Sequence, residues 1–237
     1  MDYRLLVEFK GLFDGQKYKH RDSSRGDWVA IHLYEDLATH GKSKLLAERV
    51  AAREHVLNIQ NKRRGIKARR GDGTFGELIP GMTAVVVSNF TVARGPIANV
   101  EIGAEVKILA KAMIKQIDRV MSDLKGQVAH FQSGAGNPIC VGIVGVNYAD
   151  YTIGYEGDRA YRTDGKKYLH PIQEAAEAEN RLLNEMKSKF DEFLILKYKA
   201  TNDPPYPFEW ASFADTFQDY GAALTRISRE YDTRFGP

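Results

Sequence analysis

The stretch Gly95-Pro-Ile-Ala-Asn-Val-Glu-Ile-Gly-Ala-Glu-Val-Lys-Ile-Leu109 carries the most informative pattern in this chain. This stretch is expected to form two short strands, the earlier and the later arm of a hairpin. Side chains alternate between the two faces of a β-strand, so Glu105 and Lys107 share one face of the later arm. For the same reason Asn99 and Glu101 share one face of the earlier arm. The connection between the two arms decides whether these four polar groups converge.

Two connections between the arms are compatible with the pattern. A two-residue turn leaves Asn99 and Glu101 on the face opposite Glu105. A three-residue loop, residues 102–104, instead pairs Glu101 with Glu105. Two positions further along, the same register pairs Asn99 with Lys107. We expect the second register, because it also gathers the apolar side chains of both arms on the other face, where a core needs them.

Two carboxylates placed directly across a strand pair repel each other unless a cation offsets their charge. Hard oxygen ligands on a rigid strand, with positions left for water and phosphate, suit Mg²⁺. A lysine beside the metal would hold the attacking water, while the metal stabilises charge that develops on the phosphate. The alternative interpretation is a solvated strand face on which Lys107 forms an ion pair with its glutamate neighbours.

Residues 42–147 resemble the PD-(D/E)XK nuclease superfamily, in which an acidic residue on one strand precedes an E-x-K triplet on the next, and a helix then crosses the sheet. The resemblance rests on Glu105-Val106-Lys107, on a helix expected at residues 111–131 and on an apolar strand expected at residues 139–146. It implies an α/β domain with a restriction-endonuclease-like core, in which helices flank a mixed sheet. It also implies a magnesium-dependent DNA endonuclease that hydrolyses phosphodiester bonds, in a restriction or defence system.

The resemblance implies a role for each residue of the triplet. Glu105 would ligate the metal, and the carbonyl of Val106 would be a further ligand. Lys107 would serve the attacking water. A glutamate on the preceding helix, Glu48 or Glu54, would supplement the site.

Asn99 stands where the superfamily has its aspartate, which is a departure from the pattern. An amide oxygen brings no charge, so this residue would weaken metal binding and slow the chemistry. Three explanations stay open. Glu101 takes over the role, the chain is a non-catalytic nucleic-acid-binding or structural subunit that kept the fold, or an aspartate was replaced by engineering.

A basic run follows the first expected helix, and its members are Lys62, Arg63, Arg64, Lys67, Arg69 and Arg70. Arginine offers a planar fork of donors that matches phosphate, so these residues are expected to bind double-stranded DNA. A solvated loop is the alternative. The next segment, residues 71–76, matches G-x-G-x-x-G but lacks a preceding strand and a following helix, so we expect a turn or loop there.

Hydrophobic periodicity predicts the remaining elements. Helices are expected at residues 42–64, 111–131, 171–190 and 213–231, and strands at residues 3–9, 83–92, 98–102, 105–109, 138–146 and 193–198. This order predicts a single nuclease-like α/β domain over residues 1–237, with its core at about 42–200 and a C-terminal helix at about 212–235. An exposed part of that helix would form a homodimer surface, which enzymes that cut both strands often need.

Composition restricts the classes of protein and of metal site that this chain could represent. A chain of 237 residues with net charge +3 and one cysteine fits one domain in a reducing cytoplasm. The single cysteine excludes an internal disulfide and a multi-cysteine zinc site. No run approaches the roughly 20 apolar residues that span a bilayer, so we expect no membrane association. The histidines show no paired metal spacing, and no serine lies in G-x-S-x-G.

Overall fold

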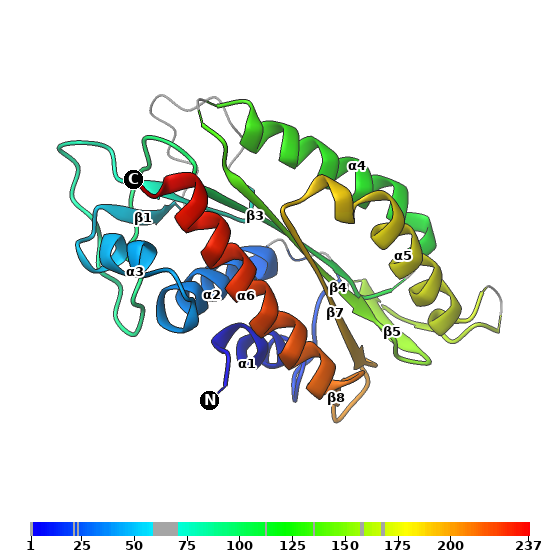
Figure 1. Ribbon diagram of the computed structural model, residues 1–237. Coiled ribbons are helices and arrows are strands. Elements are labelled where there is room, and N and C mark those ends of the chain that lie inside the picture. The colour runs from blue at the N-terminus through cyan, green and yellow to red at the C-terminus, as the bar shows by residue number, and fades with distance from the viewer. Residues whose placement is uncertain are drawn as a thin grey trace.

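The computed structural model describes every residue except 1, 21, 23, 59–70, 112, 135, 157–158 and 167–168. Within these described residues, six strands form one sheet in the order β1-β2-β3-β4-β7-β8 (Figure 1). Their bounds are β1 His55–Asn58, β2 Gly73–Glu77, β3 Ile102–Leu109, β4 Ile139–Asn147, β7 Glu192–Ala200 and β8 Phe208–Trp210. The sheet is mixed, because β3, β4 and β7 are parallel to one another and the other neighbours are antiparallel. The predicted α/β class with a mixed sheet is confirmed.

Helices cover both faces of this sheet (Figure 1). One face carries α1 Arg4–Gly11, α2 Ser24–His40 and α6 Phe213–Phe235, with the short α3 Lys44–Ala51 beside them. The other face carries α4 Met113–Gln132 and α5 Pro171–Glu185, and the 3-10 helix Lys187–Lys189 follows α5. Outside the main sheet, β5 Thr152–Glu156 and β6 Arg159–Thr163 pair as a separate antiparallel ribbon.

The core lies on both sides of β4, which is buried along its whole length. Alternate residues of this strand point to opposite faces, as the pleat requires. Ile139, Val141 and Ile143 pack against the α1, α2 and α6 side. Cys140, Val144 and Val146 pack against the α4 and α5 side. Each of the larger aliphatic side chains buried in this way contributes roughly 1.5–3 kcal/mol.

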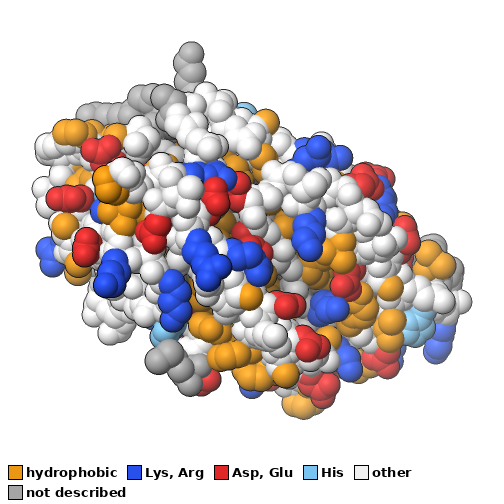
Figure 2. Space-filling view, in the orientation of Figure 1, with side chains coloured by type: hydrophobic (Ala, Val, Ile, Leu, Met, Phe, Trp, Pro, Cys, Tyr) orange, Lys and Arg blue, Asp and Glu red, His pale blue; other side chains and the backbone are white. Residues whose placement is uncertain are grey.

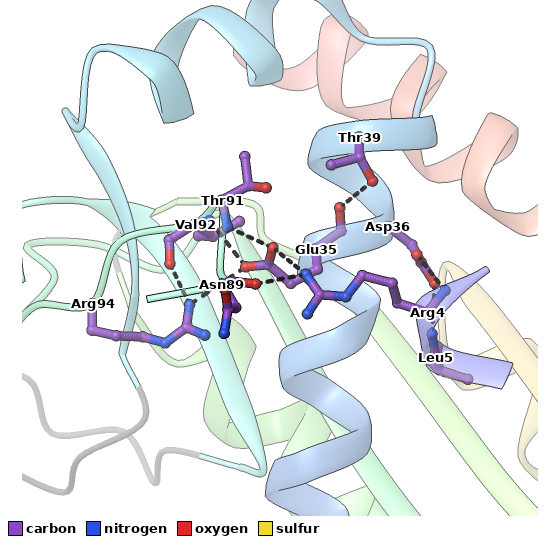
Figure 3. Close-up of polar contacts among 9 residues, drawn as sticks. All are labelled: Arg4, Leu5, Glu35, Asp36, Thr39, Asn89, Thr91, Val92 and Arg94. Carbon is purple, nitrogen blue, oxygen red and sulfur yellow. Dashed lines mark hydrogen bonds and ion pairs between the residues drawn. The ribbon is translucent and has the colours of Figure 1, made fainter. Parts of the chain in front are cut away.

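Two adjacent buried carboxylates on α2 tie distant segments to the core (Figure 3). Glu35 accepts hydrogen bonds from the backbone N–H groups of Thr91 at 2.7 Å and Val92 at 2.9 Å, and it pairs with Arg4 at 3.3 Å. Asp36 accepts from the first N–H groups of α1, those of Arg4 and Leu5, at 2.9 Å each. These charges are therefore structural, because both carboxylates are satisfied by backbone donors.

The N-terminal region differs from the sequence prediction. The strand expected at residues 3–9 is wrong, because that segment is α1, whose inner face buries Leu5, Leu6 and Phe9. The long helix α2 was not predicted. Its buried face includes His32, Glu35 and Asp36, and these polar residues interrupt the apolar periodicity that marks a helix. The expected core beginning near residue 42 therefore omits two helices that contribute to it.

The centre of the chain also differs from the prediction. The helix expected at residues 42–64 ends at Ala51, and Arg53, with φ of 58°, turns the chain into β1. Residues 83–92 form a loop with one isolated bridge, Val85 to Arg94, and not a strand. The hairpin expected between residues 98–102 and 105–109 is wrong as well, because β3 pairs with β2 and β4. A backbone pairing partner remote in sequence outweighs local β-propensity here.

The second half follows the prediction closely. The elements expected at residues 111–131, 138–146, 171–190, 193–198 and 213–231 are confirmed as α4, β4, α5, β7 and α6. The aromatic stripe of α6 packs mostly into the core through Tyr220 and Tyr231, while Phe213 stays exposed. Within the described ranges, no helix combines the length and hydrophobicity that crossing a membrane requires.

Candidate active site

Asp72 faces Glu105 across the β2–β3 pair. Gly73, the first residue of β2, pairs with Ala104, so the preceding residue lies opposite Glu105. The backbone N–H of Asp72 donates to the carbonyl of Ala104 at 3.2 Å. Its side-chain Oδ2 accepts from the backbone N–H of Val106 at 2.7 Å. The charge of Glu105 raises the pKa of Asp72, so the two carboxylates lie near each other, as the sequence had led us to expect of Glu101 and Glu105.

Lys107 lies on the same face of β3 as Glu105. Its ammonium is 2.7 Å from Oε1 of Glu105 and 4.0 Å from Oδ2 of Asp123, which α4 provides. Glu105 is 6% exposed, so the ion pair lies at the rim of the buried core. The predicted sharing of one strand face by Glu105 and Lys107 is confirmed.

The first turn of α2 completes this corner of the molecule. Gly26 approaches Asp72 so closely that a Cβ at Gly26 would lie 2.6 Å from Oδ1 of the carboxylate. The next residue, Asp27, is near enough for its charge to raise the pKa of both Asp72 and Glu105. Asp27 therefore supplies further negative charge from a third element.

The ionisable groups of this site have pKa values shifted from their ordinary values. Burial raises the pKa of Asp72 to about 7, and the charge of Glu105 adds to the rise, whereas the Val106 N–H and Lys107 oppose it. Burial also raises the pKa of Glu105, against the attraction of Lys107. For Lys107, burial favours the neutral form, but the charge of Glu105 outweighs it and raises the pKa of the ammonium. Carboxylates whose pKa values are shifted by burial and by a specific charged partner cluster at functional sites.

The residue two positions before β2, Gly71, lets the chain pack closely against the end of α4. Gly71 has φ of 65°, a conformation that side chains other than glycine rarely adopt, and the ring of Phe131 at the end of α4 packs against it. This turn aims Asp72 at β3. Residues 71–76 were predicted as a turn or loop, but residues 73–77 form β2. Its glycines serve strand packing rather than dinucleotide binding.

Glu101 lies in a different cluster from Glu105. Its carboxylate accepts hydrogen bonds from the Tyr231 hydroxyl at 2.6 Å and pairs with the His55 ring at 3.1 Å. Arg49 also contacts it at 3.4 Å. Burial opposes its ionisation, but the hydrogen bonds from His55 and Tyr231 outweigh burial and lower its pKa. The expected convergence of Glu101 on Glu105 is wrong, because Glu101 joins α6 to the sheet edge.

The other predicted residues also lie apart from the site. Asn99 accepts from the backbone N–H of Glu77 at 3.2 Å, at the far end of β2 from Asp72. Glu48 is exposed on α3, which packs on α2, α6 and β1, and Glu54 follows that helix. The helices whose charges reach the site are α2, through Asp27, and α4, through Asp123. The basic residues Arg63, Arg64, Lys67, Arg69 and Arg70 lie outside the described residues, and the Val106 carbonyl as a metal ligand remains a prediction.

Sequence reasoning missed Asp72 because β2 has no recognisable strand pattern. Its residues are Gly-Thr-Phe-Gly-Glu, which show neither β-branched enrichment nor apolar alternation. Asp27 was missed because its helix was missed. The sequence did carry one signal of a turn that positions an aspartate. Asp72 lies between two glycines, directly before the short segment that contains Phe75.

The donor set at this corner fits magnesium better than a softer metal. Among the residues that the structure describes, no group of three or more His, Cys, Asp or Glu side chains is arranged to hold an ion. Magnesium is usually bound through only one or two protein carboxylates together with water and substrate phosphate, and the pair Asp72 and Glu105 meets that need. Protein zinc sites usually have three or four protein ligands, most of them histidine or cysteine, and the described residues contain no such group.

Comparison with known proteins gave no relative for this chain. No family model, no curated protein and no solved structure matches it.

Proposed function

We propose that this chain is a magnesium-dependent endodeoxyribonuclease with a restriction-endonuclease-like core. The observation that carries the proposal is the meeting of Asp72 with Glu105 across β2 and β3, with Lys107 next on the same face. An acidic residue on one strand before an E-x-K on the next is the arrangement that the sequence resemblance implies. Asp72, and not Asn99, takes the position of the aspartate.

The order of elements supports the same proposal. After α3, the antiparallel strands β1, β2 and β3 are followed by α4, which crosses back to β4 parallel to β3. This is the sequence of elements that the resemblance implied for the stretch containing Glu105-Val106-Lys107. The reason to consider a non-catalytic subunit was the amide at position 99, and in this proposal Asp72 supplies the charge that the amide lacks.

The residues would divide the work of phosphodiester hydrolysis among them. Asp72 and Glu105 would hold Mg²⁺, with Asp27 adding negative charge nearby. When bound, the metal would stabilise charge on the phosphate and ease formation of hydroxide. Lys107 has three N–H donors, and only some of them are needed to reach Glu105 and Asp123, so it would also hold the attacking water. The Val106 N–H keeps the Asp72 carboxylate oriented throughout.

The proposal is tested by cleavage of supercoiled and linear DNA with and without Mg²⁺. We expect the wild-type chain to cleave both and Lys107→Ala to lose at least about 100-fold in rate, since it removes a group that acts on the reacting water. Lys125→Ala, an exposed lysine on α4, is the matched control and should cleave like wild type. Absence of cleavage by wild type across varied DNA, with no Mg²⁺ binding by calorimetry, would overturn the proposal.

A further inference from the structure

The ribbon formed by β5 and β6 is firmly anchored at its base. The N–H of Ile153 donates to the carbonyl of Thr201 at 2.8 Å, just beyond the end of β7. The carbonyl of Ile153 accepts from the side chain of Asn202 at 2.9 Å and lies 3.2 Å from the ring of His20. These contacts fix the base of the ribbon to the chain just beyond the end of β7.

The outer strand of the ribbon presents cations and an aromatic ring to solvent. In β6, Arg159, Tyr161 and Arg162 are exposed, and both charged residues of the strand are arginines. Arg162 stacks on the Tyr151 ring at 3.8 Å and pairs with Asp164 at 3.4 Å, so its guanidinium is held in place. This preorganisation lowers the entropy cost of binding a partner.

Strand β5 contacts segments that flank the elements of the candidate active site. The ammonium of Lys111, two residues beyond β3, lies against Gly154 and leaves no room for a side chain there. On the other side, Lys17 lies over the Tyr155 ring at 3.5 Å, in the segment that leads into α2. The ribbon therefore contacts the segment that follows β3, the strand of Glu105, and the segment that precedes α2, the helix of Asp27. Figure 1 shows β5 beside the end of β4.

The face that carries α6 offers a different surface. In Figure 2, basic side chains lie along the middle of that face with acidic and hydrophobic ones between them. Several of the arginines there are already paired, as Arg226 is with Glu192 at 2.7 Å and Arg234 is with Asp191. Arg162 of the ribbon is also paired, but its 3.4 Å contact with Asp164 is longer than these pairs, so Asp164 holds this arginine less tightly and leaves it more available to a phosphate backbone.

We propose that the β5–β6 ribbon is an arm that enters a groove of duplex DNA and holds it against the candidate active site. The major groove of B-form DNA is about 12 Å wide and admits a two-stranded ribbon. Arg159 and Arg162 would contact phosphates or base edges, and Tyr161 would pack against sugar or base. The inference names the DNA-holding surface of the proposed nuclease, so it rests on the proposed function for its biological meaning.

Binding is measured without cleavage, which separates this proposal from the nuclease proposal. The probe is a labelled 30-base-pair duplex of mixed sequence, followed by fluorescence anisotropy in EDTA across a salt series. Arg159→Ala with Arg162→Ala should lower duplex affinity at least about tenfold and reduce the salt slope by about two, one for each cation. The double variant Arg159→Lys with Arg162→Lys keeps both charges and should retain most of that slope.

Lys187→Ala with Lys189→Ala is the matched control. It removes the same charge from exposed residues before β7, at the opposite end of that strand from the ribbon base, and should bind within about twofold of wild type. The proposal is overturned if the ribbon variant binds as tightly as this control, or if wild type prefers a single strand of the same sequence. Wild type that binds duplex through the ribbon but never cleaves would overturn the nuclease proposal alone.

Discussion

Asp72 and Val106 are joined by a hydrogen bond of 2.7 Å from the backbone N–H of Val106 to the Asp72 carboxylate. The two residues are 34 positions apart in sequence, and Val106 is the central residue of the E-x-K triplet. Through this bond the backbone of β3, the strand that carries Glu105, orients the side chain of Asp72. The geometry of the candidate site is therefore built into the pairing of β2 with β3.

Replacement of Asp72 should separate the two candidate aspartate positions. Asp72→Asn removes the charge but keeps the shape, and we expect Mg²⁺-dependent cleavage to fall at least about 100-fold. Asn99→Asp should leave the rate within about twofold of wild type, because Asn99 contacts Glu77 at the far end of β2. A large gain of activity in Asn99→Asp would show that this assignment is wrong.

Magnesium affinity should rise steeply with pH near neutrality. The pKa of Asp72 is raised to about 7 by burial and by Glu105, so below that pH a proton occupies the site and competes with the cation. We expect calorimetric titration to show tighter Mg²⁺ binding at pH 8 than at pH 6, with proton release on binding. Equal affinity at both values would mean that the Asp72 carboxylate does not hold the ion.

The same raised pKa makes a prediction about stability without metal. A folded-state pKa above the unfolded value of 3.8 means that the folded chain keeps a proton that the unfolded chain releases, so stability falls as pH rises from about 4 to about 7. Half-buried His20 and buried His32, whose pKa values are lowered to about 4, act with the opposite sign. Urea unfolding of wild type and Asp72→Asn should therefore be compared across this pH range. The free energy of unfolding of wild type should fall relative to that of the variant as pH rises.

Gly26 should be intolerant of even a methyl group. Gly26→Ala places a Cβ 2.6 Å from Oδ1 of Asp72, so either the carboxylate or the first turn of α2 must shift. We expect cleavage to fall about tenfold or more, since small displacements in an active site are costly. Gly126→Ala on α4 meets nothing within 4 Å and should instead raise the free energy of unfolding by up to about 1 kcal/mol with full activity. Similar activity in both variants would contradict this prediction.

Glu35 should matter for stability rather than for catalysis. Glu35→Gln leaves Arg4 without its anionic partner and replaces one acceptor oxygen facing the N–H groups of Thr91 and Val92 with a donor. We expect a loss of roughly 3 kcal/mol in the free energy of unfolding, measured in urea. Glu48→Gln on the exposed face of α3 should change it by less than about 0.5 kcal/mol.

The sequence determined the elements whose pattern is local. The apolar residues of α4 recur at helical spacing, Pro171 stands in the first-turn position that proline favours in α5, and β4 is a largely apolar run. The placement of Glu105 and Lys107 on one face was also local, because it follows from the pleat of a single strand. These predictions needed no knowledge of what each element packs against.

Only the tertiary structure decided which acidic residue faces Glu105. Sequence spacing favoured Glu101 and Asn99, but Tyr231 and His55 hold Glu101 elsewhere, and Asn99 caps the other end of β2. Asp72 reaches the site because β2 pairs with β3 and because Gly26 allows α2 to approach closely. A strand's backbone donors and acceptors are the same at every residue, so the choice of pairing partner is made by the packing of the whole sheet and its helices, which no local stretch encodes.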